Sequence, residues 1–231
     1  MKIEIFSDFA CPFCYIGKKR LEQAIRETGL EDDVEIEYKS YQLNPYASKT
    51  EAKPFYESMM EKHENTREEV EMMTSSIQDR AKEVGLTYHF EQMRTGNTEN
   101  AHRLSKWARS HGKEAVFVEA MMDGYFTKGL NVNDKEALVQ VAKSVGLPEG
   151  EAKGVLESAR FAEELAKDRY DAQQLQVQSV PFFVFENKYG IIGAEPLEVF
   201  TRTLKQAKEV ADRRLDITGG DDACGPDGCK L

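Results

Sequence analysis

The stretch DFACPFCYIG, residues 8–17, carries two cysteines at the junction between a strand-like segment and a helical one. Residues 2–7 alternate polar and apolar side chains, as a strand does, and residues 16–27 place apolar side chains at helical spacing. Proline is favoured at the first position of a helix, so Pro12 predicts that the helix begins there with Cys11 as its N-cap. The Cys11 sulfur would then face unpaired backbone N–H groups and the positive end of the helix dipole, which favour the thiolate.

This placement predicts different roles for the two cysteines. A thiolate is the attacking species in disulfide exchange, so Cys11 is the predicted nucleophile. Cys14 lies one turn further into the helix, and we expect it to resolve the mixed disulfide by attacking Cys11. Pro12 and Phe13, which lie between the cysteines, are predicted substrate contacts. The alternative is a pair of inert, half-buried cysteines; a zinc site is not expected, because the segment lacks four ligands at recognisable spacings.

The rest of the chain predicts three more strands and a long helical region. Residues 34–41 alternate like a second strand, which most simply lies parallel to the first because a helix connects the two. Residues 180–185 and 190–192 predict a hairpin of two further strands. The expected class is therefore α/β, with a four-stranded mixed sheet and helices on both of its faces. Further helices are expected at residues 55–63, 68–84, 97–110, 114–126, 135–145, 152–156, 160–176 and 197–215.

These elements divide the chain into three parts. Residues 1–46 and 160–215 together make a discontinuous domain that contains the sheet. Residues 47–159 make an all-helical insertion domain, because nothing in them alternates like a strand. Residues 216–231 are rich in glycine and aspartate and are expected to form a flexible tail.

Composition and charge exclude several classes of protein. The net charge of −10 would repel polyphosphates, so nucleic acids and anionic membrane surfaces are not expected partners. No apolar run is long enough for a membrane span, and the first residues lack the apolar stretch of a secretory signal. Four cysteines in two close pairs indicate reactive thiols rather than a secreted disulfide scaffold. We therefore expect a cytoplasmic protein.

The residues around the dithiol resemble those of a known family. The run of residues 8–17, a helical insertion and Val180-Pro181 before the hairpin resemble the DsbA-type thiol oxidoreductases of the thioredoxin superfamily. The CPFCYIG signature and the run Asn97-Thr98-Glu99-Asn100-Ala101-His102 resemble, more narrowly, the FrnE-like branch of cytosolic proteins. The resemblance covers residues 1 to about 212 and implies a thioredoxin-like fold interrupted by an all-helical domain.

The same resemblance implies that the peptide bond between Val180 and Pro181 is cis and faces the dithiol. Val180 would then offer its backbone N–H and C=O to a substrate strand that lies across Cys11. Pro181 would take part in the catalytic site. The alternative is a trans proline that only begins an edge strand.

A second pair, Cys224 and Cys229, lies in the tail. Four intervening residues that include Pro-Asp-Gly allow a tight loop, so the two sulfurs could approach disulfide distance. A tail dithiol would exchange with Cys11 and relay electrons to it, and FrnE-like proteins commonly have such a pair. The alternatives are a metal-binding pair or exposed thiols, since the neighbouring aspartates disfavour a thiolate.

The predicted function is that of a thiol–disulfide oxidoreductase that oxidises, reduces or isomerises cysteines of protein substrates. No organic cofactor is expected, and glutathione is a candidate co-substrate. The expected partners are cysteine-containing proteins and either a low-molecular-weight thiol or a thioredoxin-type redox protein. The direction of net electron flow stays open.

Two other functions stay open. One is a glutathione-dependent isomerase or transferase of the kappa or 2-hydroxychromene-2-carboxylate isomerase type, with Ala194-Glu195 receiving an end group of glutathione; those relatives typically have serine in place of Cys11. The other is a redox-regulated chaperone or metal-binding protein. Outside the dithiol, Asn97 is expected to cap a helix, His102 to be a core or interface residue, and Lys18-Lys19-Arg20 to form a solvated helix face.

Overall fold

A mixed four-stranded sheet organises the chain. The computed structural model describes the backbone of residues 1–218 and the side chains of residues 1–213. The strands are β1 (Lys2–Ser7), β2 (Glu35–Ser40), β5 (Phe182–Phe185) and β6 (Tyr189–Ile192), in the spatial order β2-β1-β5-β6. β1 and β2 are parallel and the other pairs are antiparallel, which confirms the predicted sheet.

The strand register brings several chain segments together at one end of the strands. Ser7, the last residue of β1, pairs with Ser40, the last residue of β2. Phe182, the first residue of β5, pairs with Phe6 of β1, and Ile192, the last residue of β6, pairs with Phe182. β5 therefore begins, and β6 ends, at this same end of the sheet. The connections that follow β1 and β2, and the one that precedes β5, therefore leave the sheet close together.

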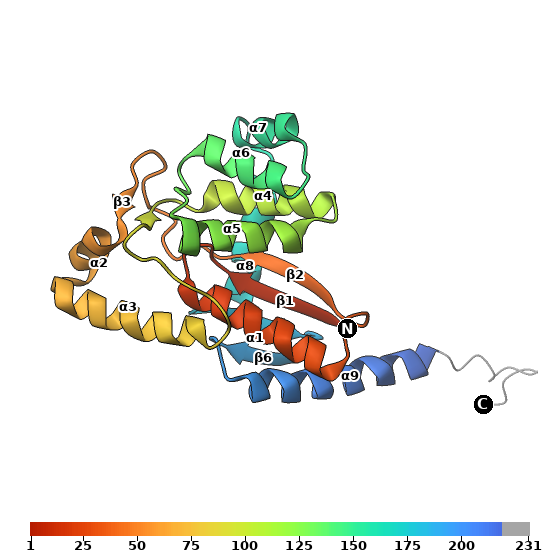
Figure 1. Ribbon diagram of the computed structural model, residues 1–231. Helices are drawn as coiled ribbons and strands as arrows, with labels where there is room; N and C mark the ends of the chain where they lie inside the picture. The colour runs from red at the N-terminus through yellow and green to blue at the C-terminus, as the bar shows by residue number, and fades with distance from the viewer. Residues whose placement is uncertain (219–231) are drawn as a thin grey trace, which may run out of the picture.

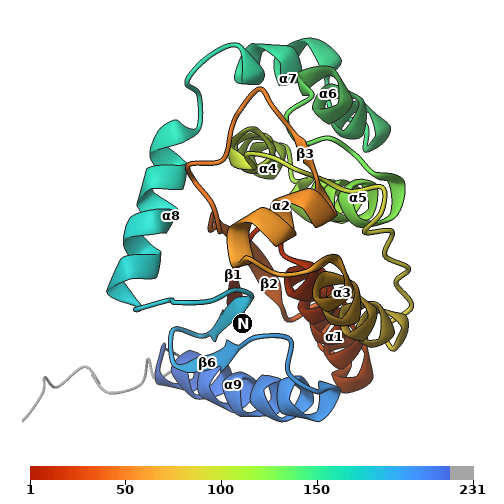
Figure 2. The same ribbon diagram turned by 90° about the vertical axis from the view of Figure 1, so that its left-hand side faces the viewer.

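Helices cover both sides of the sheet. α1 (Pro12–Thr28) and α9 (Leu197–Thr218) pack against each other, and α9 contacts the sheet through Phe200, whose ring meets that of Phe183 edge-on at 4.9 Å. α8 (Ala162–Gln174) packs against β2. Figure 2 shows α8 and α1 on opposite sides of the sheet. The helices on both sides agree with the predicted α/β class.

The insertion contains a pair of short strands as well as helices. Its helices are α2 (Phe55–His63), α3 (Arg67–Lys82), α4 (Glu99–Ser110), α5 (Glu114–Lys128), α6 (Lys135–Ser144) and α7 (Glu149–Leu156). The prediction that the insertion is all-helical is wrong in one place, because β3 (Lys53–Pro54) pairs with β4 (Arg94–Thr95). Two residues per strand are too few to show alternation. Figure 1 shows α4 to α7 together on one side of the sheet.

The helical insertion contacts α1 through aromatic side chains. The ring of Tyr15, on α1, lies 6.4 Å from that of Tyr88 and 6.1 Å from that of Phe126. Tyr88 also stacks on Phe126 at 4.7 Å and meets Phe90 edge-on at 5.8 Å. All these rings are buried, so the insertion and the helix that carries the dithiol share one core.

Side chains of the neighbouring helices occupy the outer edge of β2. Lys106 Nζ donates a hydrogen bond of 2.6 Å to the Tyr38 carbonyl, and Glu114 accepts one of 3.4 Å from the Tyr38 N–H. Asp168 accepts a hydrogen bond of 2.7 Å from the Ser40 N–H and forms an ion pair with Lys106. Burial raises the pKa of Glu114 to about 7. Backbone groups that would face solvent on an edge strand are thus paired with side chains.

The run Lys18-Lys19-Arg20 does not form a solvated face, so that prediction is wrong. Lys18 and Arg20 are 3% and 8% exposed. Lys18 pairs with Glu22 and with Glu119 of α5. Arg20 donates a hydrogen bond of 2.6 Å to the carbonyl of Ala194. These two cations hold α1 against α5 and against the segment before α9.

Candidate active site at the start of α1

Cys11 lies at the N-cap of α1, as predicted. Its backbone is extended (φ −93°, ψ 113°), and Pro12 occupies the first turn. The first turn contains no acidic residue, so no carboxylate there opposes the positive end of the helix dipole. The N–H of Cys11 donates to the carbonyl of Asp8 at 3.1 Å, and the N–H of Cys14 donates to the carbonyl of Cys11 at 3.0 Å. Backbone hydrogen bonds from both cysteines therefore fix the conformation of the turn that carries the dithiol.

The segment before β5 meets the dithiol. The peptide bond between Val180 and Pro181 is cis, which confirms that expectation. The Cys11 thiol donates a hydrogen bond of 3.5 Å to the carbonyl of Val180. The carbonyl of Pro181 accepts a hydrogen bond of 2.7 Å from Gly193, so the segment is also tied to the end of β6. Residues that are far apart in the sequence, 11 and 180, are thus in contact.

Gly17 lets α1 approach this segment closely. A Cβ atom at residue 17 would lie 3.0 Å from the ring of Phe183 and 3.1 Å from Cγ of Pro181. These distances are shorter than ordinary van der Waals contacts, so a larger residue would require the Phe183 or Pro181 side chain to shift by a few tenths of an ångström. The glycine of the CYIG run therefore allows close packing of α1 against Pro181 and Phe183.

The two thiols are free and differ in their surroundings. Cys11 is 4% exposed and Cys14 is 1% exposed. Burial raises the pKa of Cys14 well above its usual value, and the neighbouring Cys11 sulfur raises it further. The Ser7 side chain and the Asp8 backbone offset part of this increase. Cys14 is therefore held as a thiol at neutral pH.

Two aromatic residues flank the dithiol. The hydroxyl of Tyr88, from the insertion, donates a hydrogen bond of 2.8 Å to the carbonyl of Pro12. Burial raises the pKa of Tyr88, so its hydroxyl keeps the proton that it donates. Phe13 is half-buried, with the guanidinium of Arg80 5.3 Å from its ring centroid. Neither Tyr88 nor Arg80 is predicted from the sequence, because neither belongs to a motif or a periodic run that faces the dithiol.

A buried pair lies beneath the loop that leads to Cys11. Nε2 of His102 lies 3.2 Å from Oδ1 of Asp8, and both side chains are buried. The other oxygen of Asp8 accepts a hydrogen bond of 2.7 Å from the Leu43 N–H. The ring centroid of His102 lies 4.8 Å from that of Phe9. His102 is thus a buried interface residue, as predicted, and it joins α4 to the loop after β1.

Asn97 does not cap its helix as predicted. The N-cap of α4 is Thr98, one residue later. The Asn97 side chain still accepts a hydrogen bond of 3.0 Å from the Glu99 N–H, and it also donates to the carbonyls of Pro45 and Ala47. Asn97 therefore fixes the loop after β2 as well as the start of α4. The tail cysteines, Cys224 and Cys229, lie outside the described residues.

Comparison with known proteins gives the family. The family model for the DsbA-like thioredoxin domain matches residues 2–205. The chain belongs to this family. A protein described as a probable DsbA oxidoreductase of Streptomyces coelicolor has the same fold (TM-score 0.86) and is 34% identical, with 100% of this chain and 99% of that chain covered. The uncharacterized protein YwbO of Bacillus subtilis (strain 168) is 25% identical over 211 residues, which cover 90% of this chain and 97% of YwbO.

More distant structures share the DsbA-like fold only. A 2-hydroxychromene-2-carboxylate isomerase is 15% identical, with a TM-score of 0.66 and coverage of 94% of this chain and 99% of that chain. The cytosolic disulfide reductase DsbM of Pseudomonas aeruginosa is 13% identical, with a TM-score of 0.60 and coverage of 94% and 100%. Among the described residues, no helix is both long and apolar enough to cross a membrane.

Proposed function

We propose that this DsbA-like protein exchanges disulfides with protein substrates through Cys11 and Cys14. The observation that carries the proposal is the contact between the N-cap thiol and the carbonyl of Val180, beside Pro181. A thiol at a helix start is a sulfur whose anion the helix stabilises, and the backbone beside it can pair with an extended substrate. One contact thus joins the attacking atom to a docking strand.

The proposed reaction has two steps. The Cys11 thiolate attacks one sulfur of a substrate disulfide, so a mixed disulfide forms and the other substrate sulfur leaves as a thiolate. Cys14 then loses its proton and attacks the Cys11 sulfur, which releases the substrate as a dithiol and leaves a Cys11–Cys14 disulfide. Two thiols of glutathione or of a thioredoxin-type protein reduce that disulfide and are themselves oxidised. Run in reverse, the same steps oxidise a substrate.

Pro12, Phe13 and Val180 are the proposed substrate contacts. Phe13 is only half-buried although it lies between two buried cysteines, so part of its ring can meet a bound chain.

Because few cysteines are present and they form close pairs, we propose that the protein acts in a reducing compartment such as the cytoplasm.

Reduction of insulin disulfides by the wild-type protein tests the proposal. We expect turnover with glutathione or with thioredoxin as the reductant, followed by the turbidity of the released insulin chains. A glutathione-dependent isomerase or a redox-regulated chaperone would give no insulin turnover. Calorimetric titration with reduced glutathione separates these two, since only the isomerase requires glutathione to bind in the absence of a disulfide.

The tail pair, Cys224 and Cys229, remains a proposed auxiliary dithiol, and the position of α9 restricts how it can act. α9 has 22 residues and is therefore about 33 Å long. Lys208 of α9 pairs with Asp33, which lies in the turn after α1, beyond the end of that helix that is distant from Cys11. Figure 1 shows α9 continuing away from the start of α1. Cys224 follows Thr218 by six positions, which span at most about 20 Å. We therefore propose that Cys229, or the pair of a second molecule, exchanges with Cys11.

The order of the reaction distinguishes these two routes. With Cys11 and Cys14 oxidised and the tail pair reduced, exchange within one chain should have a rate that does not depend on protein concentration. Exchange between molecules should have a rate that rises in proportion to concentration, and we expect this result for a Cys229→Ser variant. Quenched samples analysed by mass spectrometry give both rates. A concentration-independent rate for Cys229→Ser would show that Cys224 reaches Cys11 of its own chain and would overturn the proposed route.

A further inference from the structure

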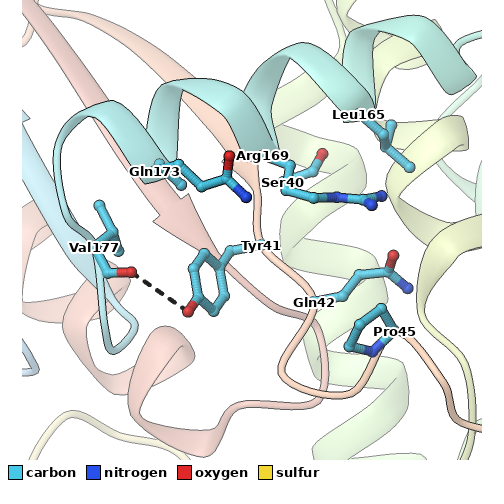
Figure 3. A pocket seen from close by; sticks show the side chains of 9 residues that line it. Ser40, Tyr41, Gln42, Pro45, Leu165, Arg169, Gln173 and Val177 are labelled. Atoms are coloured by element: carbon cyan, nitrogen blue, oxygen red, sulfur yellow. Dashed lines mark hydrogen bonds between the residues drawn. The ribbon is translucent and has the colours of Figure 1, made fainter.

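A pocket of about 190 Å³ lies between α8 and the loop after β2. Its walls include Tyr41, Gln42 and Pro45 of the loop, Arg169 of α8 and Val177. The Tyr41 hydroxyl donates a hydrogen bond of 3.5 Å to the carbonyl of Val177, and this bond joins the two walls (Figure 3).

The pocket lies close to the dithiol. Ser40 also lines the pocket and pairs with Ser7, the last residue of β1. The loop that leads from β1 to Cys11 begins directly after Ser7. Val177 precedes Val180 by three residues, so the two lie at most about 10 Å apart. An extended peptide that pairs with Val180 covers this distance with about three residues. A substrate docked at Cys11 can therefore extend into the pocket.

Arg169 gives the pocket an unpaired positive charge. Its guanidinium lies between Leu165 and Gln42 in Figure 3. Among the residues whose side chains the structure describes, none forms a hydrogen bond or an ion pair with it. The neighbouring Asp168 and Asp171 on α8 are instead engaged by Lys39. A carboxylate in the pocket would thus meet a cation that has no competing partner.

Three residues close in sequence to the pocket lining have exposed apolar side chains. Leu43 and Tyr46, on the same loop, are 48% and 95% exposed, and Leu175, directly after α8, is 47% exposed. Exposed apolar side chains of this kind are available to contact a bound polypeptide. An unfolded polypeptide supplies apolar side chains, charged side chains and a free backbone together. These features favour such a segment over a small ligand.

We propose that this pocket is a subsite for an acidic side chain of an extended protein substrate, about three residues from the reactive cysteine of that substrate. The proposal rests on the proposed disulfide exchange at Cys11 and adds a preference among its substrates. Because the chain has a net charge of −10, an acidic segment is repelled by most of the surface, so the preference depends on the local charge of Arg169.

Short peptides with a single cysteine, joined by a disulfide to thionitrobenzoate, test this subsite. Each peptide carries Asp, Asn or Lys three positions before or after its cysteine. The release of the coloured thiol in a single turnover of the reduced protein, which ends as the Cys11–Cys14 disulfide, gives kcat/KM. For one of the two placements, we expect the wild type to prefer Asp over Lys by about three- to fivefold at low ionic strength, as is typical of an exposed ion pair. The preference should fade at about 0.5 M salt.

Variants of α8 make the test specific. Arg169→Gln should abolish the preference, and Arg169→Glu should reverse it. Lys167→Glu is the matched control, because Lys167 is exposed on the same helix and does not line this pocket, so the wild-type preference should persist. Equal kcat/KM for Asp and Lys peptides in the wild type, or an unchanged preference in Arg169→Glu, would overturn the subsite and leave the proposed function intact. Failure to release the thiol from any peptide would overturn the proposed function and the subsite with it.

Discussion

The Cys14→Ser variant should accumulate a stable mixed disulfide with substrate proteins, which the wild type releases. Serine cannot attack the Cys11 sulfur, so release would depend on an external thiol. A neighbouring nucleophile in good geometry has an effective concentration far above that of any added thiol. Without added thiol, we expect release to slow by at least about a thousandfold. Non-reducing electrophoresis and mass spectrometry of the trapped species measure this effect.

Cys11→Ser is the matched control for the trap. It removes the attacking sulfur and leaves the buried thiol of Cys14, so it should trap no substrate and should lose insulin turnover. A mixed disulfide through Cys14 in this variant would reverse the proposed roles.

In the wild type, release should quicken with rising pH. Burial is the main reason that the pKa of Cys14 is raised, and burial persists when Cys11 is in a mixed disulfide. The Cys14 thiolate, which is the attacking form, is therefore scarce at neutral pH and becomes more abundant as the solution becomes alkaline.

Asp168→Ala should be strongly destabilising. Its carboxylate is 4% exposed, forms an ion pair with Lys106 at 2.5 Å, and accepts the hydrogen bond of the Ser40 N–H. Lys39, whose ammonium lies 3.5 Å from Asp168, would lose a partner as well. Removal of one member of a buried ion pair leaves a buried charge uncompensated, so we expect the free energy of unfolding to fall by about 3–5 kcal/mol.

Asp171→Ala is the control for this prediction. Asp171 pairs with the same Lys39 but is 31% exposed, so its loss should cost less than about 1 kcal/mol. Urea unfolding of both variants at neutral pH compares the two free energies. If Asp168→Ala cost no more than Asp171→Ala, the network at the edge of β2 would contribute little to stability.

Local sequence signals predicted the parts of the fold that depend on neighbouring residues. The alternation in β1 and β2 and the proline at the start of α1 each act within a few residues, so the sheet and the N-cap of Cys11 followed from them. The two-residue strands β3 and β4 carry no such pattern, since 42 residues separate the paired Lys53 and Thr95.

The errors at charged and aromatic residues have a different cause. Lys18 and Arg20 were predicted to be solvated because lysine and arginine side chains are usually exposed. Their burial depends on partners from α5 and from the segment before α9. Tyr88 reaches Pro12 from the insertion, across 76 residues of sequence. The periodicity of one segment carries no information about contacts with a distant segment. These contacts could therefore not be predicted from the sequence and are seen only in the three-dimensional structure.

The side chains along the outer edge of β2 also bear on self-association. A bare outer strand is a template on which extended chains can pair and aggregate. Lys106, Glu114 and Asp168 already occupy backbone groups of Tyr38 and Ser40 there. These backbone groups are therefore not available to an extended chain, so β2 offers little template for strand addition on this side of the sheet.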